Sequence, residues 1–426
     1  MDTNNLHNPE NLKQLIGGRD VYIWGARHEG YAARLALTRH DVHTIGYIDS
    51  SPSLAGASAF GLSITNPDIY FAGASPQKAF IIVASGFFAD EISERCIAEG
   101  WRKNSDFTVY GELRRFNYQV DVAGMCNLRC ISCPRGNWPR HRNPGFMSAK
   151  TYESLVDKIL RDDPWTGIIT LYNWGEPLLN PALPDIIKIT KGKGLLSAVS
   201  SNLAMTRDFE DVVKAGPDWF RISNSGWGEN YEITHTGARW EIFHANCRKL
   251  SEYRQHHHPE MLVELFFHIY SHNREDFPKM KALCDELGFT LRYRHAALAP
   301  LDNIALIEQG AQITDAARKT RELQFLQVED VMEIARQERM RPCFYMDHLW
   351  IDWDLSIAHC MEWYDPALKL LDKDFLSVSL DEIKAARIGS EHCRQCMEKG
   401  IHRAYCIYGD EKLIATRSSI PVQKED

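Results

Sequence analysis

The chain lacks three features that would assign it to common classes of protein. No apolar stretch approaches the ~20 residues that span a bilayer, and no long basic run offers a surface for nucleic acid or anionic membrane. The N-terminal sequence MDTNNLHNPENLKQLIGG is polar and acidic, unlike a secretory signal peptide. We therefore expect a cytoplasmic protein with no membrane and no nucleic-acid partner.

The overall composition is typical of a globular protein. The 426 residues are enough for two or three domains. Charged residues make up 25% of the chain and hydrophobic residues 44%. The 49 Lys and Arg against 57 Asp and Glu give a net charge of −8, which again argues against an acidic partner.

Cysteine is present in excess, with eleven residues. Without a secretion signal a disulfide framework is not expected, and metal ligation explains so many thiols better. Eight of them form two groups: Cys126, Cys130 and Cys133, and Cys343, Cys360, Cys393, Cys396 and Cys406. The other three, Cys96, Cys247 and Cys284, are scattered.

The first group lies in Cys126-Asn127-Leu128-Arg129-Cys130-Ile131-Ser132-Cys133, directly after an apolar run at 118–124 that predicts a β-strand. Such a loop can wrap three thiolates around one face of a cubic iron–sulfur cluster, since thiolates are the soft ligands that these clusters use. Three ligands for four irons leave one iron open for chemistry. Three cysteines can also hold zinc or simply be buried.

This Cys-x3-Cys-x2-Cys spacing resembles the signature of the radical S-adenosylmethionine (SAM) superfamily. The resemblance implies a [4Fe-4S] cluster whose open iron binds the methionine part of SAM, reductive cleavage of SAM to a 5′-deoxyadenosyl radical, and a low-potential electron donor such as flavodoxin or ferredoxin. Ser132 stands where the family often carries an aromatic residue or Met near the adenine. Trp174-Gly175-Glu176-Pro177 resembles the family's Gly-Gly-Glu-Pro motif, which implies that Gly175 and Glu176 hold the SAM amino group.

Residues 1–113 predict a Rossmann-like α/β domain. Strands at 21–24, 42–48 and 79–85 alternate with helical patterns. Gly25 and Gly30 match a dinucleotide fingerprint, but Arg27 replaces the middle glycine, and Asp49 lies where a ribose-binding acid would be. We favour a domain that has lost its nucleotide, or that positions a partner or substrate, over a nucleotide-binding one.

Residues 114–300 predict the catalytic core, a partial (β/α)6 barrel of the radical SAM type. After the first strand at 118–124, further strands are expected at 167–172, 195–200, 219–223 and 262–269, the last closing the series, with helices between them. Active groups of parallel α/β sheets collect at the carboxyl ends of the strands. The resemblance implies SAM contacts there from Ser200, Ser201, Asn202 and Ser223.

Other polar groups of the core are candidates for substrate binding or for a base. They are Arg221, His235, Arg239, His268 and His272. We interpret His256-His257-His258 as a solvated loop. Cys247 and Cys284, on helical patterns at 243–253 and 277–287, could donate a hydrogen atom to a radical, although a small buried side chain is the commoner role of such residues.

Residues 301–341 predict a helical connection, and residues 342–426 a twitch/SPASM-like iron–sulfur domain. A β-hairpin turning near Asp354, followed by a helix at 379–388 and a Cys-x2-Cys turn, can bring four thiolates together. Structural zinc uses similar spacing. The resemblance implies an auxiliary [4Fe-4S] cluster on Cys343, Cys360, Cys393 and Cys396, with Cys406 left unassigned.

Four hypotheses about function follow. The first is a radical SAM oxidoreductase that abstracts hydrogen from a small-molecule or glycan substrate, a carbohydrate or cyclitol, while the auxiliary cluster accepts an electron and a ketone forms. The second is a sugar epimerase with Cys247 or Cys284 as hydrogen donor. The third is a maturase of ribosomal peptides. The non-enzymatic alternative is a binding protein with zinc in both cysteine groups.

Overall fold

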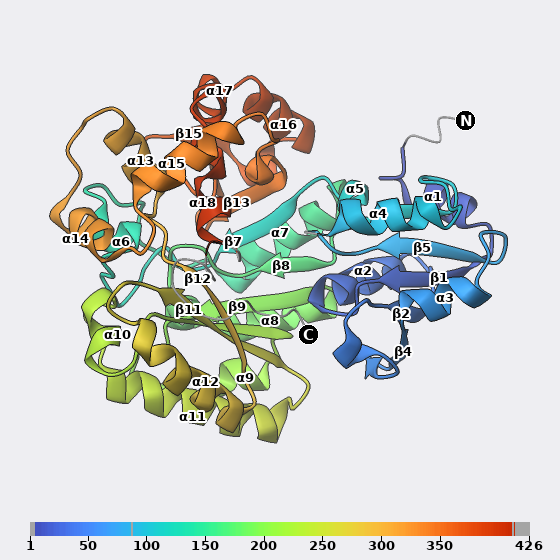
Figure 1. The fold of residues 1–426 in the computed structure, drawn as a ribbon, viewed down its shortest axis with the longest axis horizontal. Helices are drawn as coiled ribbons and strands as arrows, with labels where there is room; N and C mark the ends of the chain where they lie inside the picture. The colour runs from blue at the N-terminus through green and yellow to red at the C-terminus, as the bar shows by residue number, and fades with distance from the viewer. Residues whose placement is uncertain (1–4, 87, 411–412, 414–426) are drawn as a thin grey trace.

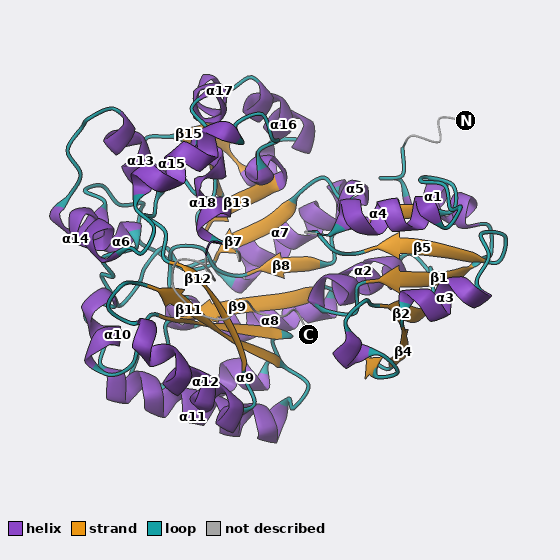
Figure 2. Ribbon diagram, in the orientation of Figure 1, coloured by secondary structure: helices purple, strands orange, loops and turns teal. Residues whose placement is uncertain are grey.

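The structure is a computed structural model that describes residues 5–86, 88–410 and 413. Two β-sheets, each covered by helices, lie beside one another (Figure 1), and helices and strands alternate through most of both (Figure 2). Among the described residues, no helix has the length and apolarity to cross a membrane.

The N-terminal sheet has the strand order β3-β4-β2-β1-β5-β6, in which all strands but β3 run parallel. Successive residues of β5 are buried on opposite faces, as expected for a sheet covered on both sides. Phe80 and Ile82 pack with α1 and α2, whereas Ile81 and Val83 pack with α3 and α4. The elements are α1 (Pro9–Ile16), β1 (Asp20–Trp24), α2 (His28–Arg39), β2 (Thr44–Ile48), β3 (Ser58–Ala59), β4 (Leu62–Thr65), α3 (Pro67–Gly73), β5 (Ala79–Val83), α4 (Ala89–Ala98), β6 (Phe107–Val109) and α5 (Tyr110–Leu113).

The packing around the turn after β1 explains the presence of Gly25, Gly30 and Asp49 without a bound nucleotide. Gly25 has φ +119°, and a Cβ there would lie 2.4 Å from the Ala84 carbonyl oxygen. A Cβ on Gly30 would lie 1.8 Å from the Gly25 carbonyl oxygen. The Asp49 carboxylate accepts hydrogen bonds from the backbone N–H of Ala26 and of Ser51, both at 2.9 Å. These groups serve the packing of the turn itself.

The main sheet has the order β12-β11-β10-β9-β8-β7-β13-β14-β15. Its first six strands are parallel neighbours in chain order, joined by helices. The strands are β7 (Asn117–Asp121), β8 (Ile168–Thr170), β9 (Leu196–Ser201), β10 (Trp219–Asn224), β11 (Leu262–Ile269), β12 (Thr290–His295), β13 (His348–Asp352), β14 (Ser356–Ala358) and β15 (Lys369–Asp374).

The helices of this part follow the sequence pattern closely. In α7, Ser148 accepts a hydrogen bond from the Thr151 N–H as N-cap, and the apolar side of the helix is buried against the sheet. The helices are α6 (Pro134–Asn137), α7 (Ala149–Asp162), α8 (Leu183–Gly192), α9 (Glu210–Lys214), α10 (Glu229–Thr234), α11 (Trp240–His257), α12 (Phe277–Leu287), α13 (Leu301–Glu308), α14 (Asp315–Leu323), α15 (Val328–Gln337), α16 (Leu380–Ile388), α17 (Glu391–Glu398) and α18 (Ala404–Tyr408). Single 3-10 turns lie at Pro52–Leu54, Pro177–Leu179, Arg274–Asp276, Phe344–Asp347, Phe375–Ser377 and Ile401–Arg403.

Two predictions for the core were wrong. The series of parallel strands does not close at 262–269, because β12 pairs with β11 as a sixth strand. Its sequence Thr-Leu-Arg-Tyr-Arg-His has the polarity of a loop, since it lies at the edge of the sheet and carries two arginines. His256 and His257 lie in the last turn of α11, not in a solvated loop, and His257 Nε2 lies 2.8 Å from the Glu210 carboxylate.

The N-terminal sheet packs on the amino ends of the main strands. The Arg39 guanidinium donates to the carbonyl oxygens of Gly194, Pro164 and Thr166, which precede β9 and β8. The His28 ring stacks on Trp219, the first residue of β10, with centroids 4.6 Å apart. Whatever the carboxyl ends of these strands bind therefore lies at the opposite end from the N-terminal domain.

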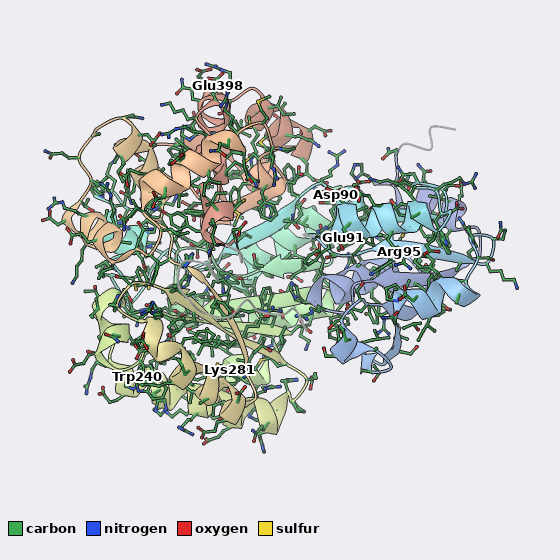
Figure 3. All side chains as sticks on the ribbon, viewed as in Figure 1. Asp90, Glu91, Arg95, Trp240, Lys281 and Glu398 are labelled. Carbon is green, nitrogen blue, oxygen red and sulfur yellow. The ribbon has the colours of Figure 1, made fainter. Side chains whose placement is uncertain are left out.

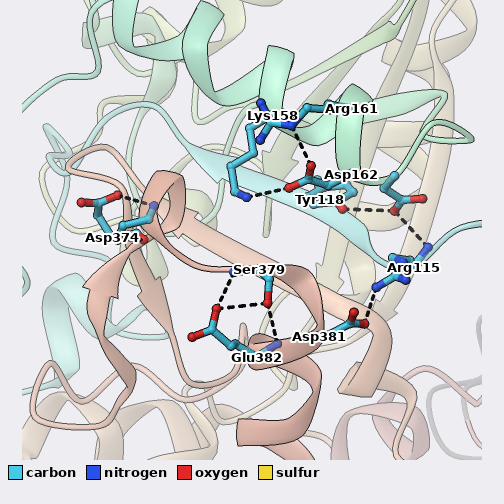
Figure 4. A network of polar contacts seen from close by, with 11 residues as sticks. Arg115, Tyr118, Lys158, Arg161, Asp162, Asp374, Ser379, Asp381 and Glu382 are labelled. Carbon is cyan, nitrogen blue, oxygen red and sulfur yellow. Dashed lines mark hydrogen bonds and ion pairs between the residues drawn. The ribbon is translucent and has the colours of Figure 1, made fainter.

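The C-terminal segment continues the main sheet. Strand β13 pairs with β7 in parallel, and β14 and β15 follow antiparallel, which confirms the predicted hairpin near Asp354. Figure 4 shows the polar contacts at this joint: Arg115 pairs with Asp381 on α16, and Ser379 and Glu382 form a capping box at its start. The predicted helices of 301–341 are also present.

Candidate active site

Backbone hydrogen bonds to residues 234 and 236 fix the loop that carries the first cysteine group. The N–H groups of Arg129 and Ile131 donate to the carbonyl oxygens of Thr236 and Thr234, at 3.0 and 3.1 Å. A Cβ on Gly136 would lie 2.2 Å from the Cys130 carbonyl oxygen, so only glycine lets the chain return this closely. The three thiols are therefore held by a rigid loop.

A cavity of about 330 Å³ opens at the carboxyl ends of the parallel strands. Its wall includes all three cysteines of the first group and every residue predicted to contact SAM. These are Cys126, Cys130, Cys133, Gly175, Glu176, Ser200, Ser201, Asn202 and Ser223. Residues that are up to 97 positions apart in the sequence, from Cys126 to Ser223, thus line one cavity.

Asp121, which the sequence analysis did not single out, anchors the loop after β8. It is the last residue of β7 and is 1% exposed. Its carboxylate accepts hydrogen bonds from the backbone N–H of Trp174 and of Gly175, both at 3.1 Å. Burial, together with nearby Asp352, raises the pKa of Asp121 to about 7. The sequence could have indicated Asp121, because it is an acid at the end of the strand that precedes the cysteine loop.

Glu176 is buried, and its carboxylate is bound by the backbone. Oε2 accepts from the Asn202 N–H at 2.8 Å and Oε1 from the Leu178 N–H at 3.1 Å. Burial raises its pKa to about 7. Glu176 thus joins the end of β9 to the loop after β8, and two carboxylate oxygens still have lone pairs free for a ligand in the cavity.

The surroundings of the first three thiols fit a metal cluster. Cys126 Sγ accepts from the Leu128 N–H at 3.4 Å and lies 3.6 Å from Asn202 Nδ2. The Arg135 guanidinium, 7% exposed, has an Nε with no partner and lies near Cys133. Burial raises the pKa of all three thiols, and a bound metal is what deprotonates such thiols. Among the described residues, no group of three or more Cys, His, Asp or Glu side chains is placed so that it could hold a single metal ion.

The far side of the cavity is formed by later strands and the C-terminal segment. Its polar residues are Arg221, Ser225, His235, His268, Tyr270, Arg294, Glu362 and Tyr405. His235 Nδ1 lies 2.9 Å from Ser225 Oγ, and burial lowers its pKa to about 4. Tyr270, which directly follows β11, lies near Ser132, so an aromatic ring lies beside the position where the cysteine loop carries a serine.

Four candidates lie elsewhere. Arg239 is 71% exposed beside Glu241, and the His272 Nε2 atom is 3.2 Å from the Asn230 carbonyl oxygen, outside the cavity wall. Cys247 on α11 and Cys284 on α12 are 0% exposed and belong to the core between these helices and the main sheet. In Figure 3 the two helices carry the labels Trp240 and Lys281. Neither thiol lines the cavity, so their positions lend no support to Cys247 and Cys284 as hydrogen donors, which stays a prediction.

The second cysteine group surrounds a second, smaller cavity of about 30 Å³. Cys343, Cys360, Cys393 and Cys396 all line it, together with residues of mostly apolar character. Cys406, on α18, is not among its lining residues. Cys393 and Cys396 lie in helix α17, not in the predicted turn, because Ser390 caps the helix by accepting from the Cys393 N–H.

Buried donors without partners surround this second cavity. Arg387 is 2% exposed, its Nε and Nη2 have no partner, and it lies near Cys343, Cys360 and Cys393. The imidazoles that line the cavity, those of His359, His392 and His402, each have one nitrogen without a partner. A negatively charged cluster of iron, sulfide and thiolate would satisfy these groups, and the donor set therefore fits one.

The two cavities share a wall. Tyr345 and Cys360 line the small cavity, and Glu362 lines the large one. The Glu362 side chain lies near Tyr345, and burial raises its pKa to about 7. Residues 360–362 therefore connect the lining of the small cavity to the lining of the large one.

Comparison with known proteins gives similarities of limited extent. No family model matches the chain. A GTP 3′,8-cyclase of Chlorobaculum tepidum is 28% identical over 119 residues, which are 26% of this chain. The chain spans about a third, 34%, of the length of that curated relative.

Several solved structures with SAM bound are partly similar to this chain. Streptococcus suis SuiB with S-adenosylmethionine is 13% identical with a TM-score of 0.41, over 74% of this chain and 83% of SuiB. BtrN with AdoMet and 2-DOIA is 14% identical with a TM-score of 0.40, over 68% and 89%. Native anSMEcpe with AdoMet is 13% identical with a TM-score of 0.43, over 66% and 82%. Similarities this low assign neither a substrate nor a reaction.

Proposed function

We propose that the protein is a radical SAM oxidoreductase with a partial (β/α)6 core and a twitch/SPASM-like C-terminal domain, which oxidises an alcohol of a carbohydrate or cyclitol to a ketone. The observation that carries this proposal is the shared wall: Cys360 lines the four-cysteine cavity, and Glu362, two residues later, lines the three-cysteine cavity. An open cluster site beside a fully ligated one suits a reaction that both starts and ends with the transfer of one electron.

In this proposal the first three cysteines hold the cluster that supplies the electron for SAM cleavage, and Cys343, Cys360, Cys393 and Cys396 hold the one that accepts the electron from the substrate. Gly175 and Glu176 bind the ammonium group of SAM, and the strand ends at 200–202 and 223 contact its ribose or carboxylate. The Tyr270 ring, next to Ser132, lies beside the adenine.

His268 is the proposed base for the substrate hydroxyl. Its Nδ1 lies 3.2 Å from the Asn224 carbonyl oxygen, so a neutral ring donates from Nδ1 and leaves Nε2 as an acceptor. Burial and two nearby arginines lower its pKa to about 3, so the ring is neutral but a weak base until a negatively charged ligand beside the arginines raises that pKa. Loss of a hydrogen atom from the carbinol carbon, a proton to Nε2 and one electron to the neighbouring cluster converts the alcohol to the ketone.

Epimerisation is disfavoured because Cys247 and Cys284, the thiols considered as hydrogen donors, are enclosed in the core. Labelling separates the two reactions. Oxidation gives a ketone with no solvent deuterium at the reacting carbon, whereas epimerisation gives solvent deuterium there and no ketone.

Anaerobic reconstitution with iron and sulfide tests the proposal. We expect roughly eight irons per chain, four per cluster, and 5′-deoxyadenosine when SAM and a reductant are added. Replacing Cys126, Cys130 and Cys133 with Ala should abolish 5′-deoxyadenosine formation, whereas Cys393→Ala with Cys396→Ala should retain it and stop ketone formation. Cys96→Ala, a buried thiol of the N-terminal domain, is the control. Colourless protein with bound zinc would favour the binding-protein hypothesis.

A further inference from the structure

Two arginines of the large cavity have no acidic partner within the part of the chain that the structure describes. Arg221 on β10 and Arg294 on β12 both line its wall, and the Nε atom of each is buried without a hydrogen-bond partner. Arg294 donates to the Tyr405 carbonyl oxygen, and Arg221 lies over the Phe266 ring at 3.9 Å. Among the described residues, no carboxylate oxygen lies within the 4.0 Å of an ion pair from either guanidinium.

Two other enclosed arginines of the chain are paired with acids. Arg292, two residues before Arg294 on the same strand, lies 3.4 Å from Glu264, and Arg142 lies 2.7 Å from Asp352. Two that have no acid among the described residues, Arg135 and Arg387, lie beside the cysteine groups. Arg221 and Arg294 are half-buried, and a partly desolvated charge without a counter-charge is costly, so a ligand that supplies one is favoured. The missing partners of Arg221 and Arg294 therefore indicate a ligand with negative charge.

Both guanidinium groups lie close to His268. Arg221 and Arg294 each lower the pKa of His268, which lies on β11 between their strands, and His268 is the register partner of Arg294. Among the described residues, Glu362 is the one acid that lines this side of the cavity, and it lies near Arg294. A single carboxylate does not balance two guanidinium groups.

We propose that the substrate carries an anionic group, a phosphate or a carboxylate, which binds between Arg221 and Arg294. This inference rests on the proposed function and narrows its substrate to an anionic carbohydrate, such as a sugar phosphate or a sugar acid. Guanidinium groups bind both anions through paired charge-assisted hydrogen bonds. The anion site lies on β10 and β12, whereas the predicted ammonium contacts of SAM, Gly175 and Glu176, follow β8.

Binding of simple anions tests the site directly. The anaerobically reconstituted protein is unfolded with urea at constant ionic strength in inorganic phosphate, in acetate or in chloride alone, and dissociation constants follow from the shift of the midpoint. We expect phosphate or acetate to stabilise the protein beyond chloride; which of them binds more tightly identifies the anion. Arg221→Gln and Arg294→Gln should each weaken binding at least tenfold, and Arg239→Gln, an exposed arginine, should not.

A second measurement needs no variant. Labelling of arginines with phenylglyoxal, read by peptide mass spectrometry, should be slowed by the bound anion at Arg221 and Arg294 and not at Arg239. The proposal is overturned if neither anion stabilises or protects the wild type, if the Gln variants bind the anions as tightly, or if they weaken SAM by the same factor, since the arginines would then hold the SAM carboxylate. Formation of 5′-deoxyadenosine, measured separately without substrate, reports on the proposed function alone.

Discussion

Replacing Gly175 with Ala should break the loop that links β7, β8 and β9. A Cβ at Gly175 would lie 1.5 Å from the Ala123 carbonyl oxygen and 2.8 Å from Asp121 Oδ1. Contact without strain begins near 3.4 Å, so one of two backbone segments must move by about 1.9 Å, the difference between 3.4 and 1.5 Å. Neither is the end of a flexible side chain, and the substitution therefore displaces the backbone.

The displacement removes the hydrogen bonds from Trp174 and Gly175 to Asp121, both 3.1 Å long. Hydrogen bonds to a charged group contribute about 1.5–3 kcal/mol each, so the expected loss is about 3–6 kcal/mol at pH 8, where Asp121 is ionised. Since Glu176 follows at once, SAM binding should fall with stability.

Urea unfolding of the metal-free protein, followed by circular dichroism, measures the first effect, and anaerobic calorimetry with SAM measures the second. Gly192→Ala is the matched control, because Gly192 ends helix α8 and nothing lies within 4 Å of its added Cβ. It should change stability by no more than about 1 kcal/mol, in the stabilising direction. The reasoning fails if Gly175→Ala costs less than about 1 kcal/mol and binds SAM as the wild type does.

Two further predictions concern buried acids. Asp352→Asn removes the partner of buried Arg142, 2.7 Å away, and should cost about 3–5 kcal/mol in urea unfolding. Asp381→Asn, which breaks the half-exposed pair with Arg115, should cost less than about 1 kcal/mol; equal losses would contradict the difference in burial. Asp121 binds a proton in the native state up to a pKa of about 7, against 3.8 when exposed. The stability that this proton gives is complete below pH 3.8 and is lost as the pH rises to about 7, by up to about 4 kcal/mol at 1.36 kcal/mol per pH unit. The difference in stability between wild type and Asp121→Asn should therefore shift in favour of the variant between pH 4 and 7, and parallel pH curves would refute this.

Much of the fold follows from local sequence patterns. Strand β11 and helix α12 have the bounds that their apolar patterns predict. Strand β12 escaped prediction because Arg294 faces the cavity and Arg292 pairs with Glu264, so polar side chains occupy positions that are apolar in a core strand. The polar side chains that hid this strand in the sequence are thus the ones that form part of the cavity and its edge.

The sequence predicted the site residues that lie in short motifs near the cysteine loop, but not those that lie far along the chain. The cysteine loop and the Gly175-Glu176 loop carry short motifs, and their residues do line one cavity. Tyr270 and Glu362 lie more than 130 residues beyond the cysteine loop and belong to no motif, so only the packing of β11 and the C-terminal segment shows that they join the site. Cys247 and Cys284 show the converse: their thiols suggested a hydrogen donor, but they lie in the hydrophobic core and not in the cavity wall.

The continuous sheet explains how two cysteine groups more than 200 residues apart keep a fixed separation. Asp121, at the end of β7 and five residues before Cys126, is the register partner of Asp352 at the end of β13. From Asp352 the chain turns through β14 and reaches Cys360 two residues after that strand. A hydrogen-bonded ladder, not a hinge, thus connects the loop of the first group to the segment that begins the shared wall. Since the rate of electron transfer depends steeply on distance, a rigid ladder at this point is what a reaction with two electron-transfer steps requires.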